Sequence, residues 1–194
     1  ARSLVIKKSD WVLKQMSWFN QISQLDSEKE YLNGETFLYL GRQYRLKIQK
    51  NSDEQSAKIN GKNLEVIIPK NADEKSSKQL VRATILDWYY QQAKENVDGI
   101  INEYSKKLGI EKPKFIIKDQ LKRWGSCTSN NLLNFNIRIA MAPSSQISYV
   151  VAHELCHIKI KDHSPEFWKT LRTILPDYEE RKEKLKNDGW QYVL

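Results

Sequence analysis

The sequence predicts an α+β fold, and three patterns carry this prediction. Short alternating runs of apolar residues within residues 36–69 indicate two β-hairpins. Apolar residues then recur at helical spacing over residues 76–108, which indicates one long helix. Residues 132–140 alternate again between apolar and polar side chains, as in a strand with one buried face. We therefore expect a small sheet backed by a long helix.

An amphipathic helix is expected near the start of the chain, over residues 10–22, with Ser9 as its N-cap. A chain of 194 residues is long enough for one domain with a full core and a small additional piece. We therefore interpret residues 1–30 as a helical extension and residues 31–194 as the main domain.

The two hairpins within residues 36–69 each have a glycine where the chain must turn. The first is expected to turn at Gly41-Arg42, with the glycine in the first turn position. The second is expected to turn at Asn60-Gly61, a pair that readily takes the positive φ angles of a type I′ turn. Both turns favour antiparallel pairing of neighbouring strands.

The long helix over residues 76–108 has signals at both ends. Ser76 and Gln79 have the spacing of a capping box, and Gly109 is placed to end the helix in the left-handed conformation. A short strand is expected next, over residues 114–118.

The region 113–175 is expected to form the core around the functional site. It contains two further helices, one opening at Ser144 and one at Pro165, because proline is favoured in a first helical turn. A last amphipathic helix is expected over residues 177–188.

The helix that opens at Ser144 contains the motif HExxH. His153 and His157 are four residues apart, so they differ by only about 40° around the helix axis and can bind one metal ion. Glu154 is displaced by about 100°, where its carboxylate can act on water as a general base. The competing interpretation is an accidental match, with both histidines packed in the core.

A third histidine strengthens the metal interpretation, because the chain has only three and His163 lies six residues after His157. An unbroken helix would place it about 240° away from His157. Pro165 disfavours helical geometry before it, which predicts a turn that brings His163 back to the ion. A carboxylate from a later helix is the alternative third ligand, with candidates Glu166, Glu179 and Glu180.

Other polar residues near this motif have two interpretations each. Arg123 could stabilise an oxyanion or hold an anionic part of the substrate, or it could simply be exposed. Asn134 and Asn136 could line a substrate cleft, or they could form the solvated face of a strand. We expect Trp124 and Trp168 to be core anchors rather than substrate platforms.

The chain has two cysteines, Cys127 and Cys156, and we expect both to be reduced thiols. Cys156 lies between the two helical histidines in sequence. A thiolate there would close a site that needs an open position for catalysis, so we interpret Cys156 as a packing residue.

Four segments carry a resemblance to a known family. Residues 123–127, 133–136, 153–157 and 163–168 read RWGSC, LNFN, HELCH and HSPEFW. Together they closely resemble the YgjP-like branch of the SprT-like zinc metallopeptidases. The resemblance implies a zincin-like catalytic core, with one zinc ion in a cleft between the HExxH helix and a small sheet. It also implies that the substrate backbone pairs along residues 132–140.

The first hypothesis is therefore a zinc metallopeptidase that acts on polypeptides. Its alternatives are a metal-dependent nucleotide pyrophosphohydrolase and a nucleic-acid-associated SprT-like protease, and the net charge of +8 is compatible with either. No P-loop or DNA-binding module is evident in the sequence. A zinc-stabilised structural domain is a further alternative, which the general-base glutamate argues against.

The sequence has no run of about 20 apolar residues and no leader pattern at its start, so we expect a cytoplasmic protein without a membrane partner. Nothing in the sequence indicates the oligomeric state.

Overall fold

The computed structural model describes residues 29–51, 54–120 and 122–194. Residues 30–192 form one compact unit, and the description below concerns this unit. The helix expected over residues 10–22 lies outside the described residues.

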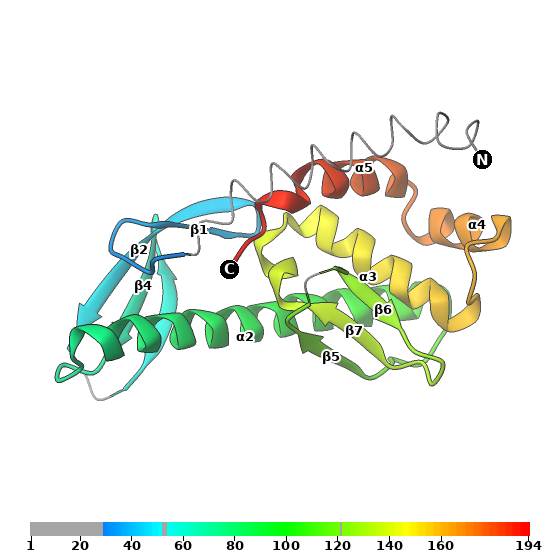
Figure 1. The fold of residues 1–194 in the computed structure, drawn as a ribbon. Helices are drawn as coiled ribbons and strands as arrows, with labels where there is room; N and C mark the ends of the chain where they lie inside the picture. The colour runs from blue at the N-terminus through cyan, green and yellow to red at the C-terminus, as the bar shows by residue number, and fades with distance from the viewer. Residues whose placement is uncertain (1–28, 52–53, 121) are drawn as a thin grey trace, which may run out of the picture. The chain divides into compact units, whose positions relative to one another are not determined.

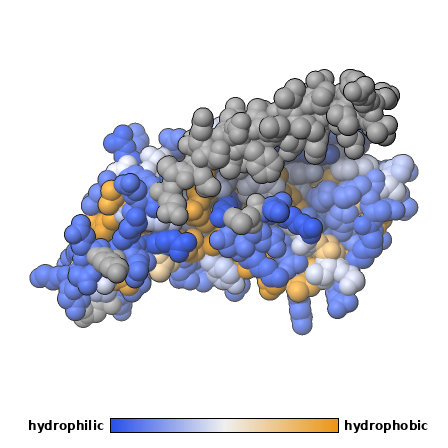
Figure 2. All heavy atoms as spheres, viewed as in Figure 1, coloured by the Kyte–Doolittle hydropathy of each residue, from blue (hydrophilic) through white to orange (hydrophobic). Residues whose placement is uncertain are grey.

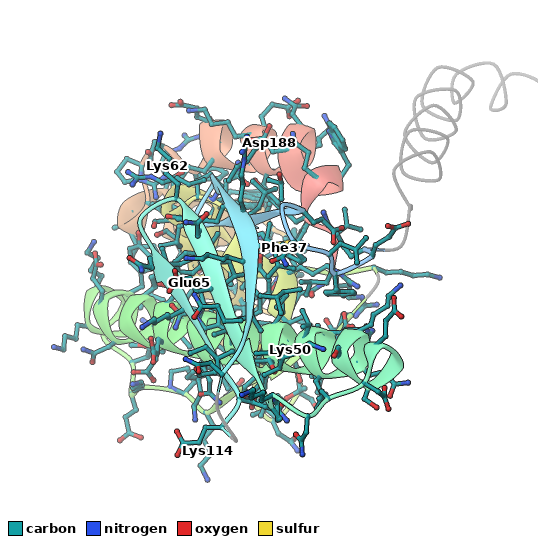
Figure 3. All side chains as sticks on the ribbon, turned by 90° about the vertical axis from the view of Figure 1, so that its left-hand side faces the viewer. Phe37, Lys50, Lys62, Glu65, Lys114 and Asp188 are labelled. Atoms are coloured by element: carbon teal, nitrogen blue, oxygen red, sulfur yellow. The ribbon has the colours of Figure 1, made fainter. Side chains whose placement is uncertain are left out.

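The first sheet has four strands, in the order β1-β2-β4-β3, and Figure 1 labels β1, β2 and β4. They are β1 (Thr36–Tyr39), β2 (Arg42–Lys50), β3 (Ser56–Asn60) and β4 (Asn63–Ile68). The two predicted hairpins are confirmed, since β1 pairs with β2 and β3 with β4 in antiparallel fashion. The hairpins join through the parallel pair β2 and β4. Across this pair, Lys47 donates to the Glu65 carboxylate at 3.2 Å, and Figure 3 shows Glu65 on the sheet.

Both turns lie one residue away from their predicted positions. In the first hairpin the turn is Leu40-Gly41, and both residues have positive φ, 48° and 76°. These angles match a type I′ turn, so the turn type demands glycine at its second position here. In the second hairpin the turn is Gly61-Lys62, where Gly61 has a φ of 57°.

The tip of the first hairpin docks on the segment that precedes the HExxH helix. Leu40 N–H donates to the Ala140 carbonyl at 3.0 Å, and Gly41 N–H donates to the Met141 carbonyl at 2.8 Å. A Cβ atom on Gly41 would lie 2.7 Å from Cγ of Pro143. The close approach therefore excludes larger residues at position 41.

The long helix α2 (Glu74–Leu108) begins two residues before its predicted start. Its N-cap is Asp73, whose carboxylate accepts from Ser76 N–H at 2.7 Å, so the predicted capping box at Ser76 is wrong. Gly109 ends the helix in the left-handed conformation, as predicted. A stripe of buried residues four apart runs along α2: Val81, Ile85, Tyr89, Ala93, Val97 and Ile101. With this stripe α2 contacts the first sheet and, farther along, the helix that carries the HExxH motif (Figure 1).

The second sheet has three strands, in the order β5-β7-β6. They are β5 (Phe115–Lys118), β6 (Gly125–Cys127) and β7 (Leu133–Asn136). Strand β6 is not among the strands expected from the sequence, and it pairs antiparallel with β7 and forms an edge of the sheet.

The strand predicted over residues 132–140 is wrong in its second half. The chain leaves the sheet after Asn136 and forms the 3-10 helix η1 (Ile137–Met141). The Asn136 side chain accepts from Arg138 N–H at 3.1 Å and so caps this helix. The apolar alternation continues because Ile137 and Ile139 are both buried within the helical turn.

Three helices follow, close to the predicted positions: α3 (Ser144–Lys159), α4 (Pro165–Ile174) and α5 (Tyr178–Asp188), with the 3-10 helix η2 (Gly189–Gln191) at the end. A buried amide fixes the end of α5 to α3. Gln146 of α3 donates to Asp188 at 2.7 Å and accepts from the Tyr192 hydroxyl at 2.9 Å. The fold is therefore mixed α+β, with two small sheets and a long helix.

The surface in the view of Figure 2 is mostly hydrophilic, with small apolar areas between charged residues. Large exposed hydrophobic residues of the described part are Leu32, Tyr90 and Ile116. In this part of the chain, no helix combines the length and the apolar character that a bilayer span requires.

Candidate metal centre

Three imidazoles converge at the C-terminal end of α3. His153 and His157 lie on α3, and His163 lies in the turn between α3 and α4. The Nε2 atom of His163 is 3.0 Å from Nε2 of His153 and 3.2 Å from Nε2 of His157. All three rings thus present the same nitrogen to one point, and these ligand atoms lie within 4.8 Å of one another.

Among the described residues, the three glutamates considered as alternative third ligands lie outside the histidine cluster. Glu179 pairs with Arg172 at 2.9 Å, and Glu180 pairs with Lys184 at 2.7 Å. Glu166 lies in the first turn of α4, outside the group. The structure therefore brings His163 to the cluster, as the Pro165 argument predicts.

An extended residue and a side-chain hydrogen bond shape the turn that carries His163. Helix α3 ends at Lys159, and Ile160 is extended, with φ −130° and ψ 110°. The Asp162 carboxylate accepts from Ser164 N–H at 3.2 Å, which turns the chain before Pro165 opens α4.

The protonation of two rings suits metal binding. His157 Nδ1 lies 3.0 Å from the Ile160 carbonyl, which can only accept, so Nδ1 carries the proton and Nε2 keeps its lone pair. Burial lowers the pKa of His157. Burial, together with the charges of the other two histidines and Lys182, lowers the pKa of His153 to about 3. Both imidazoles are therefore neutral at pH 7, the state that binds a metal ion.

Glu154 is a buried carboxyl group beside this cluster, with 7% of its surface exposed. Burial raises its pKa to about 7, and the positive charge of Arg123 partly opposes this shift. Strand β6 passes directly against it, since a Cβ atom on Gly125 would lie 2.8 Å from Glu154 Cγ and 3.0 Å from Oε1. Gly125 therefore leaves room for the carboxylate, a role that the sequence analysis missed.

A cleft of about 310 Å³ opens over the three histidines and Glu154. Its other lining residues are Gly125, Ser126, Cys127 and Lys161. Three of these four form β6, so the unpredicted strand is one wall of the cleft. A three-residue strand is too short to show alternation in the sequence, and the single available signal is the glycine in the RWGSC segment.

Aromatic residues of α4 hold the third histidine in place. Trp168 donates its indole N–H to the His163 carbonyl at 3.0 Å and stacks on the His163 ring at 5.5 Å between centroids. Tyr178 also stacks on Trp168, with 5.6 Å between ring centroids, and the Lys182 ammonium lies 4.7 Å from the indole centroid. Phe167 is fully buried and touches all three imidazoles.

The two asparagines of β7 are not among the described residues that line the cleft. Asn136 donates to the carbonyls of Gln120 and Arg123, at 2.6 and 2.9 Å, and Asn134 donates to the Ser126 hydroxyl at 3.2 Å. Both side chains are buried, so they are not a solvated face either. Their amides fix β6 and the loop before it.

The remaining predicted residues lie around the site without entering the cleft. The Arg123 side chain is exposed. Trp124 packs on Tyr192, 5.7 Å between centroids, as expected of an anchor. Cys156 is fully buried on α3, and burial raises the pKa of its thiol to about 12, which suits a packing residue.

Comparison with known proteins places the chain by its sequence. Residues 1–188 match the family described as YgjP-like, metallopeptidase domain. The metallopeptidase zymogen of Pyrococcus abyssi abylysin aligns with 18% identity over 47% of this chain and 92% of its own, at a TM-score of 0.44. The metallopeptidase zymogen of Methanocaldococcus jannaschii jannalysin aligns with 26% identity over 47% of this chain and 94% of its own, at a TM-score of 0.43. The search of the curated proteins returns no match.

Proposed function

The chain belongs to the YgjP-like metallopeptidase family, and we propose that it cleaves peptide bonds with a zinc ion bound by His153, His157 and His163. Glu154 is the proposed general base. The observation that carries this proposal is the convergence of three Nε2 atoms beside one buried carboxylate.

The donor set favours zinc over other common ions. Three imidazole nitrogens with no carboxylate in the group suit a borderline-soft ion in a tetrahedral site, whereas Ca²⁺ and Mg²⁺ prefer oxygen ligands. Three protein ligands also leave one position open, which distinguishes a catalytic zinc site from a structural one.

The residues of the cleft have separable roles in the proposed reaction. An ion bound here supplies a Lewis acid that polarises the peptide carbonyl and lowers the pKa of water. Glu154 accepts the proton of the attacking water and donates it to the leaving amine. In the metal-free protein burial raises the pKa of Glu154 to about 7. The positive charge of a bound ion would lower this pKa, which favours the ionised form that accepts a proton from water.

The substrate backbone cannot pair along β7 as expected, because β7 lies between β5 and β6. The strand with a free edge beside the cleft is β6. We propose that an extended polypeptide adds to Gly125–Cys127 as a further strand.

Arg123 is proposed as a substrate-side residue. Its exposed guanidinium acts on the Glu154 carboxyl through its charge. Arg123→Ala is therefore expected to lower turnover by about 10-fold, the cost of one charge-assisted contact, while zinc content stays unchanged. Lys122→Ala removes a neighbouring exposed charge and serves as the control. Equal turnover in both variants would return Arg123 to the surface.

We also propose that residues 31–194 form a zincin-like catalytic domain preceded by an extension over residues 1–30. A cytoplasmic location is proposed from the two free cysteines, which suit a reducing compartment.

Turnover and metal content measured together test the proposed function. Zinc-loaded protein is expected to cleave members of a peptide library, and Glu154→Gln is expected to lower the rate by about 100- to 10,000-fold while close to one zinc per chain remains. A variant that loses zinc with its activity would make Glu154 a ligand or a structural support. A wild-type protein that hydrolyses nucleoside triphosphates and leaves the peptides intact would overturn the peptidase assignment for this site.

A further inference from the structure

Lys161 is a cationic residue on the wall of the cleft. It lies in the turn that carries His163 and faces the C-terminal end of β6. Of the described residues that line the cleft, it alone carries a fixed positive charge.

The partners of Lys161 are neutral. Its ammonium donates to the Asn131 side-chain oxygen at 2.6 Å, and it lies 3.5 Å from the Thr128 carbonyl and 3.8 Å from Cys127 Sγ. Asp162, the adjacent acid, is engaged by Ser164 N–H. Within the described chain no carboxylate lies at ion-pair distance from Lys161.

One short hydrogen bond orients Lys161 without saturating it. An ammonium group has three donors, and Asn131 takes one of them at short range. The other two contacts are at the upper limit of hydrogen-bond length. A stronger acceptor in the cleft can therefore replace them, while Asn131 keeps the ammonium in position.

We propose that Lys161 selects substrates that carry a carboxylate close to the bond that is cleaved. This inference rests on the proposed peptidase function and names its substrate class. The carboxylate comes from an aspartate or glutamate side chain or from the C-terminus of the substrate, since both present the same group.

The charge of the cleft favours a carboxylate over a polyphosphate. A carboxylate carries one negative charge, which Lys161 balances. Polyphosphate sites use several cations or a glycine-rich loop of backbone N–H groups. The described lining residues supply one lysine beside the proposed ion, and they include the Glu154 carboxyl, whose ionised form repels further negative charge. The same comparison argues against nucleotides as substrates of this cleft.

Matched peptides test the proposal. Each pair differs by Glu against Gln, or Asp against Asn, at one position near the cleaved bond, and a further pair has a free or an amidated C-terminus. The wild type is expected to show a kcat/KM about 10- to 100-fold higher for the acidic member, the range of hydrogen bonds to charged groups. The pair with the largest ratio identifies whether a side chain or the C-terminus supplies the carboxylate.

Variants of Lys161 separate selection from support of the turn. Lys161→Met keeps the stem and removes the charge, so the preference should disappear while cleavage of neutral peptides continues. Lys161→Arg should keep the preference, and Lys161→Glu should favour peptides with lysine at the same position. Lys169→Met removes an exposed charge on α4 that lies outside the cleft, and it should behave as the wild type.

Binding gives a readout that does not depend on turnover. The Glu154→Gln protein, titrated calorimetrically with the preferred acidic peptide, should bind about 10-fold more tightly than the same protein with Lys161→Met added. An equal affinity, or an acidic preference that survives in Lys161→Met, overturns the inference and leaves the peptidase function intact. An equal loss on acidic and neutral peptides, together with a loss of zinc, would make Lys161 a support of the turn. Absence of any peptide cleavage by zinc-loaded wild type overturns the proposed function and this inference together.

Discussion

The two halves of the histidine cluster are built differently. His153 and His157 share one face of a regular helix, so their relative position follows from a four-residue spacing and the helix geometry. His163 is exposed and lies in a turn, so its position depends on contacts with residues of other elements. Local helix geometry thus fixes the positions of the first two histidines, whereas tertiary contacts fix the position of the third.

The contacts of the two halves reflect this difference. On the helical side the histidines are partly buried and Glu154 is buried, and this burial lowers the pKa of His153 to about 3 and raises the pKa of Glu154 to about 7. The turn side is held by Trp168, and the indole of Trp168 in turn contacts Tyr178 and Lys182. We therefore expect mutations on the helical side to lower both the stability of the fold and the affinity for metal. Mutations on the turn side should lower the affinity for metal alone.

The largest expected difference separates His153→Ala from His163→Ala. Each variant loses one of three ligands and should bind zinc at least about 100-fold more weakly, beyond the range for outer-shell partners. Unfolding of the metal-free protein by urea should separate them. His153→Ala removes the packing of a partly buried ring on Phe167 and should cost about 2 kcal/mol, whereas the exposed His163→Ala should stay within about 0.5 kcal/mol. Equal destabilisation by the two variants would remove the distinction between the halves.

The next effect concerns Glu154 and the pH dependence of the metal-free protein. Its pKa is about 7 in the folded state, above the ordinary value of 4.5 for a glutamate, so the folded state favours the protonated form. The resulting stability is present in full below pH 4.5 and is lost as the pH rises through 7. Glu154→Gln mimics the protonated form, so its free energy of unfolding should exceed that of the wild type by about 3 kcal/mol at pH 8. At pH 4 the two free energies should be equal. A difference independent of pH, measured by urea unfolding, would mean that the charge is not the cause.

The smallest effect tests the support of the turn. Trp168→Phe keeps an aromatic ring on His163 and removes the indole donor, and Trp168→Leu removes both. We expect zinc affinity to fall by about 10-fold and about 100-fold, the range for residues that orient a ligand. The visible spectrum of the cobalt-substituted protein should change in parallel, since it reports ligand geometry. Trp124→Phe, at an anchor that packs on Tyr192, is the control and should leave affinity and spectrum unchanged.

The same contrast explains what could be predicted from the sequence. The HExxH helix and its two histidines follow from periodicity over sixteen residues of α3. The third histidine was predictable because Pro165 breaks the helix and the chain offers no other histidine. Both inferences use local rules with strong signals.

The rest of the cleft depends on side chains that act over longer range. Strand β6 has three residues and no alternation to recognise. The end of β7 is set by the Asn136 side chain, which caps η1 and bonds the carbonyls of Gln120 and Arg123, although its polar position predicts a solvated or cleft-lining residue. The position of Lys161 on the wall of the cleft could not be predicted, because a lysine in a turn is ordinarily a surface residue.

The docking of the first hairpin on the segment before α3 has a consequence for folding kinetics. Leu40 and Gly41 bond to Ala140 and Met141, about 100 residues farther along the chain, immediately before the helix that carries the metal ligands. Contacts between such distant residues form slowly, because the entropy of closing the loop is lost before the contact is gained. We therefore expect the start of α3 to become ordered late, after α2 has formed, so that the metal ion binds to a nearly complete protein and does not nucleate its folding.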